Sequence, residues 1–134
     1  MLFRSVFNEF PTLNLVCLES GFTFVPTLLW RINKEWRGVR AETPWIDRPP
    51  AEIVKERIRF TLQPVDAPKD PKVLLKTIEH MQSEDFLLFS TDYPHGHFEG
   101  VDCLPDGLPD SLIRKILVDN PLNAYPRLAQ ESAP

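Results

Sequence analysis

Cysteine and glycine are scarce in this sequence of 134 residues, which contains two cysteines and five glycines. Cys17 and Cys103 lie far apart, so the chain has neither a disulfide framework nor a Cys-x-x-Cys metal motif. The glycines form no phosphate-binding loop and no Gly-x-Ser-x-Gly nucleophile elbow. These absences argue against nucleotide-binding proteins and serine hydrolases, and the low cysteine content favours a reducing, cytoplasmic compartment.

Long hydrophobic runs and excess positive charge are missing as well. No apolar segment approaches the length of a membrane-spanning helix, and the N-terminal residues lack the apolar core of a signal peptide. Lys and Arg number 15 against 19 Asp and Glu, which gives a formal net charge of −4 at pH 7. Because the chain has no concentrated basic face, we expect neither nucleic acid nor a membrane surface as a partner.

Three apolar runs predict β-strands, near residues 13–19, 58–63 and 86–91. They are almost uninterrupted, which is typical of strands covered on both faces of a parallel sheet. Segments that begin near residues 26, 51, 70 and 109 have the apolar spacing of amphipathic helices. The last of these has four apolar residues on one side: Leu112, Ile113, Ile116 and Leu117.

Alternating strands and helices predict an α/β fold of right-handed βαβ units around a parallel sheet. A complete (β/α)8 TIM barrel takes about 250 residues, and this chain has strands for roughly the last three βα units. We therefore expect residues 1–134 to be the C-terminal portion of a barrel domain, with about three parallel strands and outer helices.

The strand ends carry the candidate functional residues, because in parallel α/β folds functional groups gather at the C-terminal edge. Asp92 follows the third strand, where a carboxylate is costly to desolvate unless a cation or hydrogen-bond donors meet it. It is therefore a candidate metal ligand or catalytic base, or else a cap of the turn into Pro94. Glu19 ends the first strand. It could act together with Asp92 in acid–base catalysis, or it could form hydrogen bonds that hold the following loop in place.

Two histidines follow Asp92 in the spacing Asp-x-x-His-x-His, and Glu99 lies nearby. His95 and His97 could chelate a metal if the backbone between them were extended. Gly96 makes the backbone of this loop flexible, so the loop would not hold the two histidines in that arrangement. The alternative interpretation is that both histidines lie in a solvent-exposed loop and bind no metal.

Several segments occur in a fixed order along the chain: Phe10-Pro-Thr-Leu-Asn-Leu-Val, Leu18-Glu-Ser-Gly, Val25-Pro, Leu88-Phe-Ser-Thr-Asp-Tyr-Pro-His95, and Lys115-Ile-Leu followed by Asn120 and Tyr125. The series resembles amidohydrolase-related metal-dependent enzymes of the group that contains aminocarboxymuconate-semialdehyde decarboxylase. The resemblance spans about residues 3–128. Its most specific element is the Ser/Thr-Asp-Tyr-Pro-His string after a strand.

The resemblance implies a metal-dependent TIM-barrel hydrolase or decarboxylase that acts on a small organic substrate, often aromatic or carboxylated. It implies zinc or manganese at the Asp of strand eight, which here is Asp92. Relatives that decarboxylate place a catalytic histidine where this chain has Glu19, and Pro121 replaces their usual alanine. Relatives also bind metal through a His-x-His or Glu-x-His on strand one and a His on strand five, and this sequence contains neither strand.

Two functional classes follow. The first is an incomplete barrel, inactive by itself, which would take a small-molecule substrate once an N-terminal segment completes it. The second is a non-catalytic binding or structural module that keeps the fold elements. In either case only Asp92 carries over as a family ligand, so we expect the chain alone to hold no tight zinc or manganese. The expected protein partner is therefore either an N-terminal segment that completes the barrel or a second copy of this chain.

Overall fold

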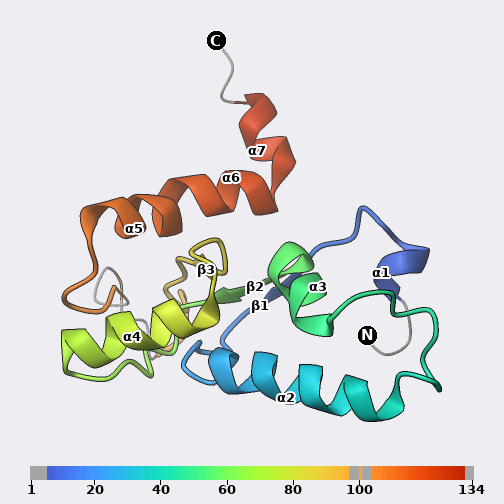
Figure 1. The fold of residues 1–134 in the computed structure, drawn as a ribbon. Helices are drawn as coiled ribbons and strands as arrows, with labels where there is room; N and C mark the ends of the chain where they lie inside the picture. Colours follow the sequence, from blue (N-terminus) through green and yellow to red (C-terminus); the bar gives the residue numbers. More distant parts are fainter. Residues whose placement is uncertain (1–5, 97–99, 101–103, 132–134) are drawn as a thin grey trace.

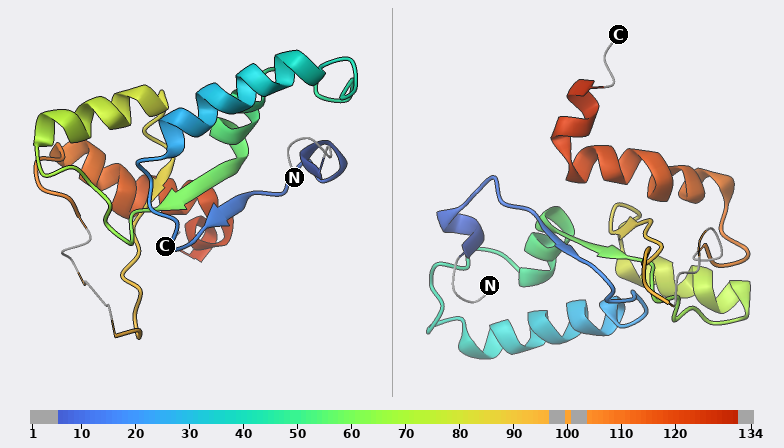
Figure 2. Two further views of the ribbon diagram at one scale, coloured as in Figure 1. Left: turned by 90° about the horizontal axis from the view of Figure 1, so that it is seen from below. Right: turned by 180° about the vertical axis from the view of Figure 1, so that it is seen from behind.

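The three predicted strands form one parallel sheet, which confirms the α/β fold. The computed structural model describes residues 6–96, 100 and 104–131, with strands β1 (Leu15–Cys17), β2 (Ile58–Thr61) and β3 (Leu87–Leu88). β2 lies in the middle and pairs with both neighbours in parallel, as Figure 2 shows for β1 and β2. The three strands therefore end at the same edge of the sheet.

Helices precede, connect and follow the strands (Figure 1). They are α1 (Val6–Glu9), α2 (Val25–Val39), α3 (Pro50–Arg57), α4 (Pro71–Met81), α5 (Asp110–Arg114), α6 (Asn120–Ala124) and α7 (Pro126–Glu131). α2 packs against α3 and α4, while α6 contacts β3. Within the described part of the chain, no helix combines the length and hydrophobicity needed to cross a membrane.

The core lies on one face of the sheet, between the strands and the helices. Phe60 and Leu62, two residues apart at β2, belong to one buried cluster with Leu29 of α2, Leu74 of α4 and Ile116. Burial of such side chains stabilises each by about 1.5–3 kcal/mol relative to exposure. The same packing fixes β2 in the middle of the sheet and so determines where its neighbours end.

The C-terminal helix contains a π turn (Lys115–Asp119) between α5 and α6. At its end the backbone N–H of Asn120 donates to the carbonyl oxygen five residues back, as in a π-helix. Pro121 follows and has no N–H to donate, so the ordinary helical hydrogen bond is lost at this point in any case. Of the residues that the sequence places on one side of this helix, Leu112 and Ile116 are buried and Leu117 is 43% exposed.

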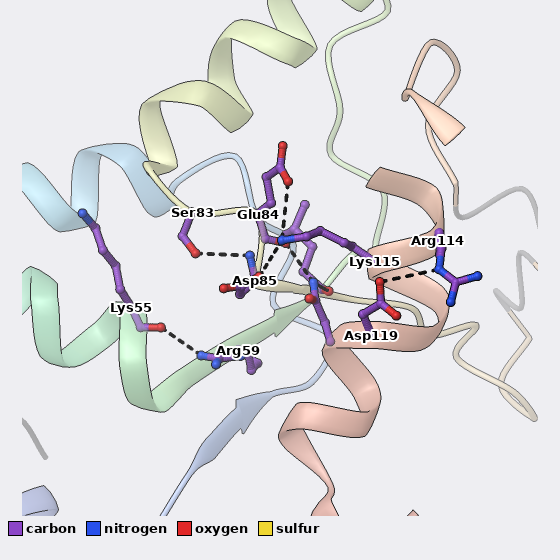
Figure 3. Close-up of polar contacts among 10 residues, drawn as sticks. Lys55, Arg59, Ser83, Glu84, Asp85, Arg114, Lys115 and Asp119 are labelled. Carbon is purple, nitrogen blue, oxygen red and sulfur yellow. Dashed lines mark hydrogen bonds and ion pairs between the residues drawn. The ribbon is translucent and has the colours of Figure 1, made fainter. Parts of the chain in front are cut away.

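The π turn anchors the C-terminal helix to the start of β3. Asn120 Nδ2 donates to the carbonyl oxygens of Glu84 at 2.8 Å and Leu87 at 2.9 Å. Lys115 Nζ lies 2.8 Å from Asp85 Oδ1 and 3.5 Å from a Glu84 carboxylate oxygen (Figure 3). The hydrogen bond to Asp85 raises the pKa of Lys115. These contacts lie at the N-terminal end of the strand, the end that in barrel folds serves stability.

The outer edges of β1 and β3 predict self-association of the isolated chain. Within the described residues, neither strand has a second strand partner, and open strand edges template pairing with other chains. We expect light scattering to detect oligomers or aggregates, and we expect thermal unfolding below about 65 °C, the upper end for ordinary mesophilic domains. A monodisperse monomer with a cooperative transition above that temperature would contradict this prediction.

Candidate metal centre

A hydroxyl group of β2 holds Glu19 at the end of β1. The backbone N–H of Glu19 donates to Thr61 Oγ1 at 3.0 Å, and Thr61 is buried. The same hydroxyl lies 3.4 Å from the carbonyl oxygen of Cys17. Glu19 has a φ of 53°, in the left-handed region that non-glycine residues seldom adopt. The chain thus turns sharply at Glu19, and the carboxylate is 56% exposed.

Replacing Thr61 by valine tests this hydroxyl. We expect Thr61→Val to lower the free energy of unfolding by about 1–3 kcal/mol, because the part-buried N–H of Glu19 would lose its acceptor. The matched control is Thr77→Val on α4, where the exposed threonine hydroxyl donates only to a carbonyl of its own helix. Urea unfolding of both variants measures the difference. Equal effects at the two positions would show that the β2 hydroxyl does not hold Glu19.

Asp92 lies beyond the end of β3, and its side chain is only 11% exposed. It too has a positive φ, of 61°. Its Oδ1 lies 2.7 Å from His95 Nδ1, and its carbonyl oxygen accepts a hydrogen bond from the backbone N–H of His95 at 2.8 Å. Two contacts therefore fix the histidine relative to the carboxylate, although the imidazole is 66% exposed.

The structure brings Glu19, Asp92 and His95 together. One potential ligand atom from each lies within 4.8 Å of the other two, and His95 Nδ1 is 3.9 Å from Glu19 Oε1. Glu19 follows β1 and Asp92 follows β3, so the pair spans the end of β2 between them. This placement follows from the parallel sheet: strand ends that are distant in sequence meet at one edge.

A third carboxylate, Asp66, positions the loop that carries Glu19. Its Oδ1 accepts a hydrogen bond from the backbone N–H of Phe22 at 3.3 Å, and its Oδ2 accepts one from the Thr23 hydroxyl. Gly21 has a φ of 63°, and a Cβ there would lie 3.0 Å from the Asp66 carboxylate. The signal in the sequence that could have indicated this role of Asp66 is Gly21, because a residue without a side chain permits the close approach.

The other histidine, acidic and cysteine residues named in the sequence are not part of this site as the described residues form it. His97, Glu99 and Cys103 lie outside the described residues. Cys17 is a free thiol, and burial raises its pKa, so the thiolate that nucleophilic catalysis needs is disfavoured there.

Comparison with known proteins identifies the family. A family model described as Amidohydrolase matches residues 1–127. The chain belongs to the amidohydrolase family. No curated protein matches the sequence.

Solved structures share the fold. An amidohydrolase from Mycobacterium avium subsp. paratuberculosis K-10 is 27% identical, with a TM-score of 0.68 over 92% of this chain and 31% of its own. 5-Carboxyvanillate decarboxylase from Sphingomonas paucimobilis is 17% identical, with a TM-score of 0.70 over 94% of this chain and 37% of its own. A dihydroxybenzoic acid decarboxylase from Polaromonas sp. JS666, solved with manganese and 2-nitroresorcinol, is 21% identical, with a TM-score of 0.63 over 93% and 37%.

This amidohydrolase-family chain therefore spans about a third of the length of the solved structures that it matches. The part that it shares with them is the three-stranded α/β unit described above.

The donor set at the candidate site suits a divalent metal. Two carboxylates and one imidazole are ligands that both zinc and manganese accept. Three ligand atoms within 4.8 Å of one another can close around one ion with small side-chain movements. The contact between His95 and Asp92 would have to open, because Nδ1 now faces the carboxylate oxygen. The site is thus chemically suitable but incompletely arranged for a metal.

This arrangement predicts weak metal binding by the chain alone. The Glu19 and His95 side chains are exposed, so metal binding would have to order both of them at a cost in conformational entropy. A tight site avoids this cost because its ligand side chains are already held in place. We expect dialysis to remove zinc or manganese, as measured by metal analysis. Retention of one equivalent that is lost in His95→Ala but kept in the control His80→Ala would contradict this expectation and would establish a tight local site.

Proposed function

We propose that this chain supplies one part of a metal-dependent active site that hydrolyses or decarboxylates a small carboxylated aromatic compound. The observation that carries the proposal is the meeting of Glu19, Asp92 and His95 at the C-terminal edge of a parallel sheet. That edge is where barrel enzymes place their chemistry. The decarboxylases of aromatic acids that share the fold support this substrate class.

The roles of the side chains follow from their surroundings. Asp92 is the least exposed of the three and would hold the metal, which when bound supplies the positive charge that polarises a carboxylate or activates water. Glu19 is exposed at the mouth of the site and would accept or return a proton on the substrate side. His95 would bind the same metal through Nδ1 once its contact with the Asp92 carboxylate opens.

Product analysis tests the proposal and separates its two reactions. The longest polypeptide that the gene encodes would be loaded with manganese or zinc and incubated with dihydroxybenzoates and with esters and amides of aromatic acids. Decarboxylation releases carbon dioxide, whereas hydrolysis in ¹⁸O-labelled water places the label in the product acid. We expect metal-dependent turnover in one of the two assays. Metal-loaded protein that turns over none of these compounds would overturn the proposal.

The second candidate function is a non-catalytic module, and exposure of the site favours it. Glu19 and His95 are both more than half exposed, whereas catalytic groups work best where water is excluded. A module would bind carboxylated aromatic compounds without turnover. Calorimetric binding of dihydroxybenzoate that is unchanged in Asp92→Asn would support this function over the first.

A further inference from the structure

A hollow lies between α2 and the start of α3, two helices that pack side by side (Figure 1). Its volume is about 260 Å³, and its lining residues are Asn33, Trp36, Arg37 and Pro49. The first three are spaced i, i+3 and i+4 along α2, so they share one face of that helix. Trp36 lies 11 residues, or roughly 16 Å, from the start of α2, which the loop of Glu19 enters. The hollow is therefore separate from the candidate metal centre.

A buried hydrogen-bond donor at this hollow has no acceptor. Trp36 is only 6% exposed, and its indole Nε1 has no hydrogen-bond partner within the described residues. The indole nitrogen can only donate, and buried polar groups in folded proteins are almost always hydrogen-bonded. An acceptor oxygen on a molecule bound in the hollow would satisfy this N–H. The unpaired donor therefore points to a ligand.

The cations around Trp36 favour an anion as that acceptor. Arg37 lines the hollow, and the guanidinium carbon of Arg40 lies 5.0 Å from the centre of the Trp36 ring. Both arginines are exposed, and neither forms an ion pair with a described carboxylate. Arg48 differs, because its guanidinium nitrogens bind the Glu56 carboxylate at 2.6 and 2.7 Å. A guanidinium without a carboxylate partner can bind a carboxylate or a phosphate through two parallel hydrogen bonds.

The start of α3 adds further donors and positive potential. Its N-cap, Pro49, makes no side-chain cap. Asn33 of α2 takes this role, because its Oδ1 accepts a hydrogen bond from the backbone N–H of Ala51 at 3.0 Å. The Nδ2 group of the same amide remains available as a donor, since it has no partner in the part of the chain that the structure describes. The first turn of a helix also carries a positive partial charge that favours anions.

We propose that this hollow binds a small oxyanion, a carboxylate or inorganic phosphate, through the Arg37 guanidinium, the Trp36 indole N–H and the Asn33 amide. Its volume lies below the roughly 300–1,000 Å³ of sites for drug-sized ligands, which suits so small a group. The long, exposed side chain of Arg40 closes over the bound anion. The anion joins α2 to the start of α3 and so stabilises the folded chain by mass action. This site does not depend on the chemistry proposed for Asp92.

The test is titration of the full chain, labelled with ¹⁵N at its three tryptophans, with inorganic phosphate and separately with benzoate. We expect one of the two anions to move the indole N–H signal of Trp36 downfield, as a new hydrogen bond does, and to leave the signals of Trp30 and Trp45 in place. The anion that moves the signal identifies the ligand as a phosphate or a carboxylate. Trp36→Phe assigns the signal, because that variant lacks it.

Equilibrium dialysis with the radiolabelled anion measures affinity, and it does so even if the chain self-associates. We expect Arg37→Met to weaken binding at least ten-fold, because it removes the charged donor. The matched control is Arg31→Met, which removes another exposed arginine of α2 outside the hollow and should leave binding unchanged. Circular dichroism checks that both variants remain folded.

The proposal is overturned if neither anion binds, if all three indole signals move alike, or if Arg37→Met and Arg31→Met bind the anion equally. Asp92→Asn should bind the anion as the unmodified chain does, with or without added metal. Failure of this site and failure of the proposed chemistry are therefore distinguishable.

Discussion

Asp92→Asn should lower kcat by on the order of 10²–10³-fold while leaving assembly intact, because the metal that this carboxylate would hold stabilises charge in the transition state. Asparagine has nearly the shape of aspartate but no negative charge, so it neither accepts a proton at neutral pH nor attracts a divalent cation strongly. The carboxylate is 11% exposed and its Oδ1 contacts His95 at 2.7 Å, whereas the Glu19 carboxylate of the same site is 56% exposed. Steady-state kinetics on the completed protein, together with metal analysis, measures the effect.

The matched control for this variant is Asp47→Asn. Asp47 is an exposed loop aspartate before α3, so the same change of charge should leave kcat within two-fold, on the order expected for a surface site. Light scattering should give the same particle mass for both variants. Equal activity of Asp92→Asn and the unmodified protein would remove the metal-dependent mechanism and leave the binding module as the better function.

Asn120→Ala should lower the free energy of unfolding by about 2–4 kcal/mol. Its Nδ2 donates to the carbonyl oxygens of Glu84 and Leu87, and the residue is almost fully buried, so alanine would leave two acceptors without donors. The change would also loosen the start of β3, the strand that leads to Asp92. Urea unfolding measures it, with the midpoint and slope fitted separately.

Asn123→Ala provides the control on the same helix. Asn123 is exposed, and its replacement should change the free energy of unfolding by no more than about 0.5 kcal/mol. A loss below about 0.5 kcal/mol at Asn120 as well would mean that the two hydrogen bonds contribute little and that the C-terminal helix is held by its apolar contacts instead.

The sequence predicted helices and strands well where the residues that determine them lie close together in the chain. Asp70 precedes Pro71, and the structure has Asp70 accepting a hydrogen bond from the backbone N–H of Lys72 at the start of α4. The apolar runs predicted three strands and their parallel pairing, although the strands are shorter than the runs. Capping and alternation depend on neighbours within a few residues, so a sequence reports them directly.

The C-terminal helix shows where such reasoning failed. The sequence grouped Leu117 with Leu112 and Ile116 on one side of the helix, but only Leu112 and Ile116 are buried. Nothing in the sequence indicated the π turn, or that Asn120 at its end would donate to the backbone of β3. Pro121 was visible in the sequence, but the sequence did not indicate which groups the neighbouring Asn120 would contact. The packing of the C-terminal helix against β3 determines those contacts.

By itself, the sequence determined the family, the α/β fold and the positions of Glu19 and Asp92 at strand ends, because strand periodicity and short motifs are local properties. Only the tertiary structure decided that these two carboxylates meet, and that His95 contacts Asp92 while Asp66 supports the loop of Glu19. Residues 73 positions apart approach one another because β2 lies between β1 and β3, an order that core packing sets and that no local pattern records.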